Sequence, residues 1–216
     1  MAQFAVIGLG SFGATVALEL TKLNHDVIGI DTIKRNVESL ADRITHAVIA
    51  DATDEHVLEE LNIQNCDAVV VAIGEDIEAS ILCVLNLKNL GVERILVKAK
   101  TKAHHTILSH LHVSKIIHPE EDMGVRVAQA LNYPMVSRYM ALDDDRYIVK
   151  VPVQAKLNHV NLSGILKQEP NIKLLLLKRD QQILYETDVN FTLQAGDVLI
   201  LEGSLSHLRK LSGCFV

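Results

Sequence analysis

A glycine-rich turn near the start of the chain has the spacing of a phosphate-binding loop. The residues Gly8-Leu9-Gly10-Ser11-Phe12-Gly13 stand between a short apolar run typical of a buried strand and a pattern typical of a helix. In such a loop the first glycine permits a tight turn, the second lets the backbone approach a pyrophosphate, and the third lets the helix pack on the strand. The helix N-terminus adds unpaired N–H groups and the positive end of the helix dipole. We therefore predict that the turn binds nucleotide phosphates rather than merely reversing the chain.

A carboxylate follows the second predicted strand where a ribose would lie. Asp31 comes eighteen positions after Gly13, close to the spacing of about 20 residues at which an acidic residue binds a ribose. Its oxygens can accept hydrogen bonds from the 2′ and 3′ hydroxyls, and its charge would repel a 2′-phosphate. The alternative is that Asp31 only caps the next helix. The sequence favours a nucleotide without a 2′-phosphate.

Polar residues also follow the third and fourth predicted strands. Asp51-Ala52-Thr53-Asp54 closes the third strand and Ala72-Ile73-Gly74-Glu75 closes the fourth. Open α/β sheets bind ligands at the carboxyl ends of their strands, so we expect both segments to border the site. Asp51 and Thr53 are equally expected as N-caps of the helix that begins near Glu55. Gly74 would let the backbone contact the ribose or the adenine.

The elements that position these residues form a predicted α/β domain. Short, nearly continuous apolar runs are typical of parallel strands covered on both faces. They are Phe4 to Gly8, Val27 to Asp31, Ala47 to Ala50, Ala68 to Ile73, Ile95 to Lys98 and Ile116 to His118. Helical patterns lie between and after them, at Phe12 to Leu23, Lys34 to Asp42, Glu55 to Leu61, Ile77 to Leu90, His104 to Leu111 and Glu120 to Leu131. This alternation predicts a Rossmann-like, doubly wound parallel sheet over residues 1–135.

A second, smaller domain is predicted over residues 136–216. Pro134 and the acidic run Asp143-Asp144-Asp145 mark the linker region, after which the pattern changes to an α+β domain. Its predicted strands are Arg146 to Val153, Ile172 to Lys178, Ile183 to Glu186 and Asp197 to Leu201, with helices at Leu162 to Lys167 and Leu205 to Leu211.

Composition narrows the class of protein. The 216 residues are 49% hydrophobic and 22% charged, as in an ordered globular protein. The net charge of −6 argues against a nucleic-acid binder, because such proteins usually carry a basic face. The three cysteines are odd in number, without metal-like spacing, and suit a reducing compartment. No leader and no membrane-length apolar run are visible, so we expect a cytoplasmic protein that reaches a membrane only through a partner.

The motifs occur in an order that resembles a known family. The glycine-rich turn, Asp31 and the third and fourth strand ends are followed by Val97-Lys98-Ala99-Lys100, Ile117-His118-Pro119-Glu120 and Gly196-Asp197-Val198-Leu199. Together they resemble the regulators of potassium conductance (RCK) family, in particular the KtrA/TrkA type of bacterial potassium-uptake subunit. The resemblance spans essentially the whole chain.

The resemblance implies a regulatory subunit and no enzyme activity. It implies a homo-oligomeric ring, usually an octamer, beneath a membrane potassium transporter of the KtrB/TrkH type. ATP and ADP would compete for the Rossmann site and favour the active and inactive ring. The matching positions around the nucleotide would be Ser11, Asp31, Thr32, Ile33, Asp51, Ala52, Ile73, Gly74, Glu75, Lys98, Ala99, Lys100, His104 and Glu120.

Four of these positions raise separate questions. A carboxylate beside a triphosphate would be repelled unless a cation lay between them. We therefore predict that Mg²⁺ or another cation lies between Glu120 and the phosphates when ATP is bound. Glu120 would equally favour the N-terminus of its own helix. Lys98 and Lys100 would offer charge to phosphates, although two such lysines are more often solvated. Ser11 stands where some relatives carry an arginine, which leaves open how ATP is distinguished from ADP.

Other functions remain open on the sequence. An NAD(H)-dependent oxidoreductase or redox sensor would use the same fingerprint, but no catalytic signature accompanies it. The histidines near His104 and His112 are better explained as surface residues than as a metal cluster. The second domain could sense a second messenger or an ion, although a role in dimerisation fits it better. Met123, Val127, Ala130 and Leu131 make the Glu120 to Leu131 helix a dimer-crossover candidate or an internally packed element.

Overall fold

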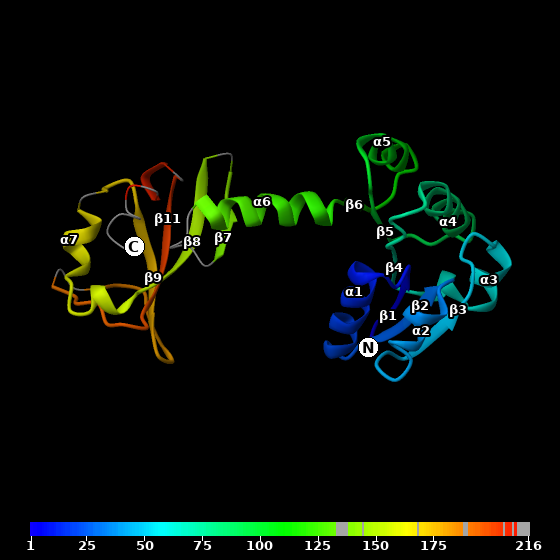
Figure 1. Ribbon diagram of the computed structural model, residues 1–216, viewed down its shortest axis with the longest axis horizontal. Coiled ribbons are helices and arrows are strands. Elements are labelled where there is room, and N and C mark those ends of the chain that lie inside the picture. Colours follow the sequence, from blue (N-terminus) through cyan, green and yellow to red (C-terminus); the bar gives the residue numbers. More distant parts are fainter. Residues whose placement is uncertain are drawn as a thin grey trace. The chain divides into compact units, whose positions relative to one another are not determined.

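The first strand lies inside a parallel sheet, and helices cover both faces of that sheet. In the computed structural model the described residues are 1–132, 138–143, 145–167, 169–187, 190–204, 206–208 and 210. The first sheet has six parallel strands in the order β3-β2-β1-β4-β5-β6, the order of dinucleotide-binding folds (Figure 1). Its strands are β1 (Gln3–Ile7), β2 (Asp26–Asp31), β3 (His46–Ile49), β4 (Ala68–Val71), β5 (Ile95–Lys98) and β6 (Lys115–Ile117).

Helices cover the two faces of this sheet as right-handed crossovers require. Helices α1 and α2 pack over a cluster that contains Val6, Ala17 and Leu40. Helices α3, α4 and α5 pack over a second cluster that contains Leu58 and Leu87. The helices are α1 (Ser11–Lys22), α2 (Lys34–Glu38), α3 (Glu55–Glu60), α4 (Ile77–Asn89) and α5 (Lys102–His110), followed by α6 (Pro119–Asn132).

The predicted doubly wound sheet is confirmed, with every predicted strand within two residues of an observed one. The largest departure among the helices is α2, which ends at Glu38 although the pattern predicted a helix to Asp42. The chain continues there in turns, and Ser39 and Asp42 are residues whose side chains compete with helical backbone hydrogen bonds.

The C-terminal part contains a five-stranded antiparallel sheet in the order β10-β9-β11-β8-β7. One face packs on α7 (Leu162–Leu166) and a short 3₁₀ turn, η2 (Ala155–Leu157). The small α+β domain is therefore confirmed as a fold class. Its strands are β7 (Arg138–Ala141), β8 (Arg146–Pro152), β9 (Lys173–Arg179), β10 (Gln182–Leu184) and β11 (Val198–Ser204).

Strand β7 was not predicted from the sequence. It pairs with β8 in the register Met140↔Ile148, at the edge of the sheet. A short edge strand buries little, and Met140 is 56% exposed, so no alternating pattern marked it. The predicted helix at Leu205 to Leu211 lies partly outside the described residues, and Cys214 lies outside them.

In the Gly196-Asp197-Val198-Leu199 segment, a turn and a buried ion pair explain the first two residues. Gly196 has a φ of +94°, which favours glycine. Asp197 is 1% exposed and accepts hydrogen bonds from the guanidinium of Arg179 at 2.8 Å and from the N–H of Gln194. Burial would raise the pKa of Asp197, but these hydrogen bonds outweigh it and lower the pKa, so the pair stays charged.

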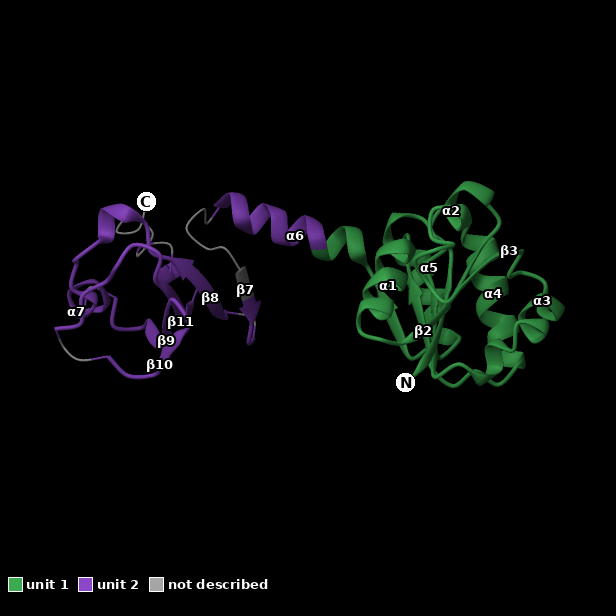
Figure 2. Cartoon of the chain, turned by 90° about the horizontal axis from the view of Figure 1, so that it is seen from below, with its two compact units in different colours: residues 1–122 green, residues 123–216 purple. Residues whose placement is uncertain are grey.

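The chain divides into two compact units, Met1–Asp122 and Met123–Val216 (Figure 2). This division lies within α6. The predicted boundary at residue 135 falls outside the described residues and stays a prediction. Among the helices that the structure describes, none is long and apolar enough to cross a membrane.

Candidate functional site

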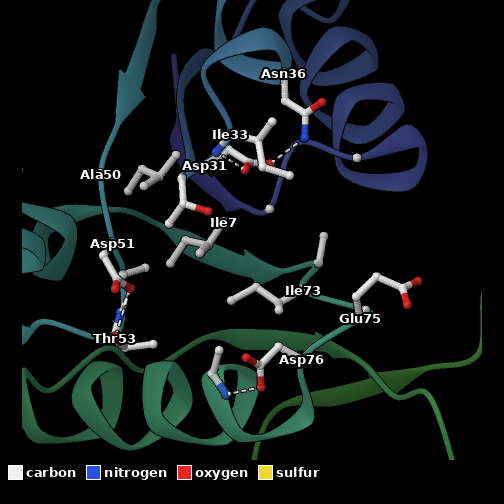
Figure 3. Close-up of a pocket in the computed structure, with 18 of the residues that line it drawn as sticks. Ile7, Asp31, Ile33, Asn36, Ala50, Asp51, Thr53, Ile73, Glu75 and Asp76 are labelled. Carbon is white, nitrogen blue, oxygen red and sulfur yellow. Dashed lines mark hydrogen bonds between the residues drawn. The ribbon is translucent and has the colours of Figure 1, made fainter.

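A cleft of about 690 Å³ opens at the carboxyl ends of β1, β2, β3 and β4. This volume is in the range of pockets that bind small ligands. Open α/β sheets bind their ligands at the carboxyl ends of the strands, where the strand order reverses, and here that point lies between β1 and β4. Figure 3 shows side chains from all four strand ends facing one space. The predicted site residues that line it are Gly8, Gly10, Asp31, Thr32, Ile33, Asp51, Ala52, Thr53, Ala72, Ile73, Gly74 and Glu75.

The glycine-rich turn has the geometry that its spacing predicts. Gly8 has a φ of +90°, and a Cβ atom there would lie 3.0 Å from the backbone of Ala72 and Ile73. A Cβ atom on Gly13 would lie 1.8 Å from the carbonyl oxygen of Gly8, so only glycine allows α1 to start this close to β1. Around Gly10 a Cβ atom would meet nothing within 4 Å. Gly10 therefore borders open space, into which a ligand can approach the backbone.

The N-terminus of α1 faces this space without a protein cap. Gly10 is the N-cap residue, no side chain of the described chain accepts from the first turn, and that turn contains no acidic residue. The first N–H groups of a helix need acceptors, and phosphate oxygens supply them together with a charge that suits the helix dipole. Ser11 and Phe12 belong to this turn, although neither lines the cleft.

Asp31 ties the glycine-rich turn to the second strand. One carboxylate oxygen accepts from the N–H of Leu9 at 2.7 Å and from the amide of Asn36 at 3.0 Å. The other accepts from the N–H of Ile33 at 2.8 Å (Figure 3). A carboxylate offers about four lone-pair sites, so three of them are used. A ribose that binds through two hydroxyls therefore has to displace one donor, and the side chain of Asn36 moves most easily.

Asp51 and Thr53 form a local turn and do not cap the following helix. The Asp51 carboxylate accepts from the N–H of Thr53 at 2.9 Å and from its hydroxyl at 2.7 Å. These bonds, the backbone one first, lower the pKa of Asp51 below its usual value. The N-cap of α3 is Asp54, which accepts from the N–H of His56. The capping alternative for Asp51 and Thr53 is therefore wrong, and Asp51 points a charged carboxylate at the cleft.

Several lining residues were not predicted. Asp76 caps α4 by accepting from the N–H of Ala79 at 2.9 Å, and the Asp before an apolar helix was a visible capping signal. Ile7 ends β1, Ile30 is the last residue but one of β2, and Ala50 follows β3, so the strand-end rule that predicted Ala72 would also have found them. The remaining unpredicted residues are Asn36, Glu78, Ala79 and Leu82, which depend on how α2 and α4 lie against the sheet.

The predicted residues on β5 and beyond lie beside the cleft and do not line it. The ammonium of Lys98 is 2.5 Å from the Glu120 carboxylate, and that of Lys100 is 2.9 Å from the Glu75 carboxylate. Each lysine, chiefly by its hydrogen bond, lowers the pKa of its partner carboxyl. Glu120 lies in the first turn of α6, as expected, but its side chain is engaged by a lysine.

Ala99 and His104 support this region from inside the core. Ala99 is 3% exposed and His104 is 1% exposed. The Nδ1 atom of His104 accepts from the N–H of Lys100 at 3.3 Å, which assigns the proton to Nε2. Burial, and then the nearby His118, lower the pKa of His104, so the ring is neutral. His104 therefore fixes the backbone of Lys100.

The prediction that the histidines near His104 and His112 lie on the surface is wrong for His104 but is confirmed for His105, His110 and His112, which are exposed. His105 and His118 stack with ring centres 5.0 Å apart, and their nearest ring nitrogens are 2.8 Å apart. Across the described residues, no three His, Cys, Asp or Glu side chains are grouped as metal ligands.

Comparison with known proteins identifies the family. The TrkA-N domain model matches residues 4–119. The Ktr system potassium uptake protein A of Bacillus subtilis (strain 168) is 36% identical, in an alignment that covers 96% of this chain and 94% of that protein. The protein of the same name from Vibrio alginolyticus is 34% identical, with 96% and 95% covered.

Solved structures share the fold. The GsuK RCK domain has a TM-score of 0.63 at 15% identity over 99% of this chain and 47% of that chain, so this chain spans about half its length. The GsuK channel bound to NAD has a TM-score of 0.60 at 15% identity, over 100% of this chain and 39% of that one. The match to residues 4–119 and the relatives above 30% identity show that this chain belongs to the TrkA-N family, as an RCK subunit of the KtrA type.

Proposed function

We propose that this chain is the regulatory subunit of a potassium-uptake system and that ATP or ADP in the cleft sets its state. The names of the relatives supply the process, because they are potassium uptake proteins of Ktr systems. The observation that carries nucleotide binding is the uncapped N-terminus of α1 opposite the Asp31 carboxylate, in one cleft. The proposal assigns a ligand and no catalytic step.

A nucleotide acts as a switch only if it binds two conformations of the protein with different affinity. ADP and ATP place their shared adenosine alike, so the difference must come from the last phosphate. The charged side chains beside the cleft, the Lys98–Glu120 and Lys100–Glu75 pairs, are the groups that would respond to it. Exchange of a carboxylate for a phosphate at either lysine would alter contacts between β4, β5 and the start of α6.

The test is a thermal titration of the full chain with ATP, ADP, NAD⁺ and NADH. A ligand at about 100 times its Kd raises the free energy of unfolding by about 2.7 kcal/mol, which gives a clear increase in Tm. We expect larger increases with ATP and ADP than with the dinucleotides. A larger increase with NADH would favour the NAD(H) sensor, which the strand order and the glycine-rich turn also accommodate. No increase with any of the four would contradict nucleotide binding.

A cation is part of the proposal for the ATP state. Glu120 and Glu75 could supply oxygen ligands to Mg²⁺ beside the phosphates, as hard cations prefer. Glu120 would first have to leave Lys98, so the cation and the lysine compete for one carboxylate. Addition of Mg²⁺ should therefore increase the Tm shift with ATP more than the shift with ADP.

Assembly into a ring is proposed from α6 and from the family. No residue of α6 is buried in the single chain, and Met123, Val127 and Leu131 are 55%, 51% and 79% exposed. Each lies four positions after the one before, so they form one apolar stripe, as a helix that crosses to a second copy requires. Through such a ring the cytoplasmic subunit would contact a membrane potassium transporter.

Two charges placed in this stripe should disrupt assembly. We expect the Met123→Glu, Val127→Glu double variant to lose about half of its mass or more in light scattering, because a two-fold interface meets each charge twice. Ala128→Glu, on a different face of α6, should leave the mass unchanged. If the double variant kept the mass of the unmodified chain, α6 would not be the interface.

A further inference from the structure

The cleft occupies one half of a fold that can bind a dinucleotide across two halves. Dinucleotide-binding folds consist of two mononucleotide-binding halves, and the second nucleoside lies beyond the central strands. Here the lining residues come from the ends of β1 to β4 and from α2 and α4. The matching space for a second nucleoside would lie at the ends of β4, β5 and β6, on the other side of the glycine-rich turn (Figure 1).

The side chain of Lys98 fills this second half. It is the last residue of β5, and its side chain is only 15% exposed. Its Nζ, Cε and Cδ atoms lie 3.2, 3.5 and 3.8 Å from the position that a Cβ atom on Gly74 would take. The stem therefore lies flat across the end of β4, and the absence of a side chain at Gly74 makes this possible.

Two further groups hold the ammonium of Lys98 in place. It lies 2.5 Å from the Glu120 carboxylate, at the start of α6, and 6.0 Å from the ring centre of Phe12, at the start of α1. Lys98 thus extends from the end of β5, across the end of β4, toward the α1 N-terminus, which is the path that a second nucleoside would follow from the pyrophosphate.

Phosphates and a second nucleoside make opposite demands on this lysine. A terminal phosphate can replace Glu120 as the partner of the ammonium without moving the stem, and Glu120, 71% exposed, returns to water at little cost. An uncharged nicotinamide nucleoside offers no anion. It could enter only by displacing the stem, which would break the ion pair of the ammonium with Glu120 and expose a side chain that is otherwise largely buried.

We propose that Lys98, laid across Gly74, is the residue that selects nucleoside di- and triphosphates against dinucleotides. It does so by blocking the second nucleoside while offering its charge to the terminal phosphate. The inference rests on the proposed binding of ATP or ADP and adds the side chain that excludes the second nucleoside of a dinucleotide.

Two substitutions of Lys98 separate the steric effect of its stem from the effect of its charge. Lys98→Met keeps the length of the stem and removes the charge, whereas Lys98→Ala removes both. ADP and NADH affinities would be measured by calorimetry on the full chain and each variant, with Lys102→Ala, an exposed lysine on α5, as the control. Thermal unfolding without ligand would show that each variant is folded.

We expect ADP affinity to fall about tenfold in both Lys98 variants, because each loses a charge-assisted hydrogen bond. NADH affinity should rise about tenfold or more in Lys98→Ala and stay low in Lys98→Met. Lys102→Ala should change neither.

Four results would overturn the inference. If NADH affinity did not rise in Lys98→Ala, or rose equally in Lys98→Met, Lys98 would be a phosphate contact and not a block. If the unmodified chain bound NADH as tightly as ADP, selection would be absent while nucleotide binding stood. If it bound neither, the proposed function would fail and this inference with it.

Discussion

Replacing Asp31 by alanine is expected to weaken ADP binding by about 100-fold. A hydrogen bond to a charged group contributes about 1.5–3 kcal/mol, and each 1.4 kcal/mol is a factor of about ten, so two bonds to the ribose hydroxyls account for this loss. The substitution also removes the acceptor for the N–H of Leu9, which anchors the glycine-rich turn, and for the N–H of Ile33, which follows β2. The measurement is calorimetric titration at a temperature where circular dichroism shows the variant folded.

The same substitution should lower stability, and a control separates the two effects. Leaving the N–H of the buried Leu9 without its acceptor costs about 1–3 kcal/mol of unfolding free energy, whereas the N–H of the exposed Ile33 can bond to water. Asp54→Ala removes the N-cap of α3 near the same edge of the sheet and should cost about 1 kcal/mol while leaving ADP affinity unchanged. Unchanged ADP binding in Asp31→Ala would show that the ribose does not lie on β2.

Gly13→Ala is expected to destabilise the N-terminal unit by about 3 kcal/mol or more, near the upper limit for overpacking. The added Cβ atom would lie 1.8 Å from the carbonyl oxygen of Gly8, far inside contact distance. Because both atoms belong to the backbone or are fixed to it, α1 must move away from β1 and its N-terminus leaves the phosphate position. Chemical denaturation of the full chain measures the change.

Gly10→Ala is the matched comparison for this prediction. A Cβ atom on Gly10 would meet nothing within 4 Å, so the unfolding free energy should change by less than about 1 kcal/mol. The methyl group would instead point into the space where we place the phosphates and should weaken ADP binding. Equal stability of the two variants would contradict the packing role of Gly13, and unchanged ADP affinity in Gly10→Ala would contradict the phosphate position.

Much of the first domain could be read from the chain because its signals are local. Strands such as β4 (Ala68–Val71), buried on both faces, appear as continuous apolar runs, and helices appear as periodic ones. The positive φ of Gly8 and the contact between Gly13 and Gly8 are local requirements for glycine, and Asp31 follows at a spacing that one βαβ unit fixes. Whether these residues bind a nucleotide stays a prediction.

Prediction from the sequence failed in two situations. In one, neighbouring residues were equally suited to the same role; in the other, a strand buried too little surface to leave an apolar pattern. Asp51 and Asp54 are both acceptable caps by type, and the backbone geometry of the turn decided in favour of Asp54. The edge strand β7 (Arg138–Ala141) gained its conformation from pairing with β8, so its own residues carried little signal.

The chain by itself determined the sheet, the glycine-rich turn and the place of the acidic residue of β2, because short-range sterics and periodic burial specify each of them. Only the tertiary structure decided that the cleft lies at the ends of β1 to β4, whereas the side chain of Lys98 lies beyond it, at the end of β5. The contact of Lys98 with Glu120 joins residues far apart in the sequence, and the stem of Lys98 reaches across β4 only because Gly74 leaves room. Such a contact depends on how β4, β5, α1 and α6 pack together, and no spacing along the chain encodes that distance.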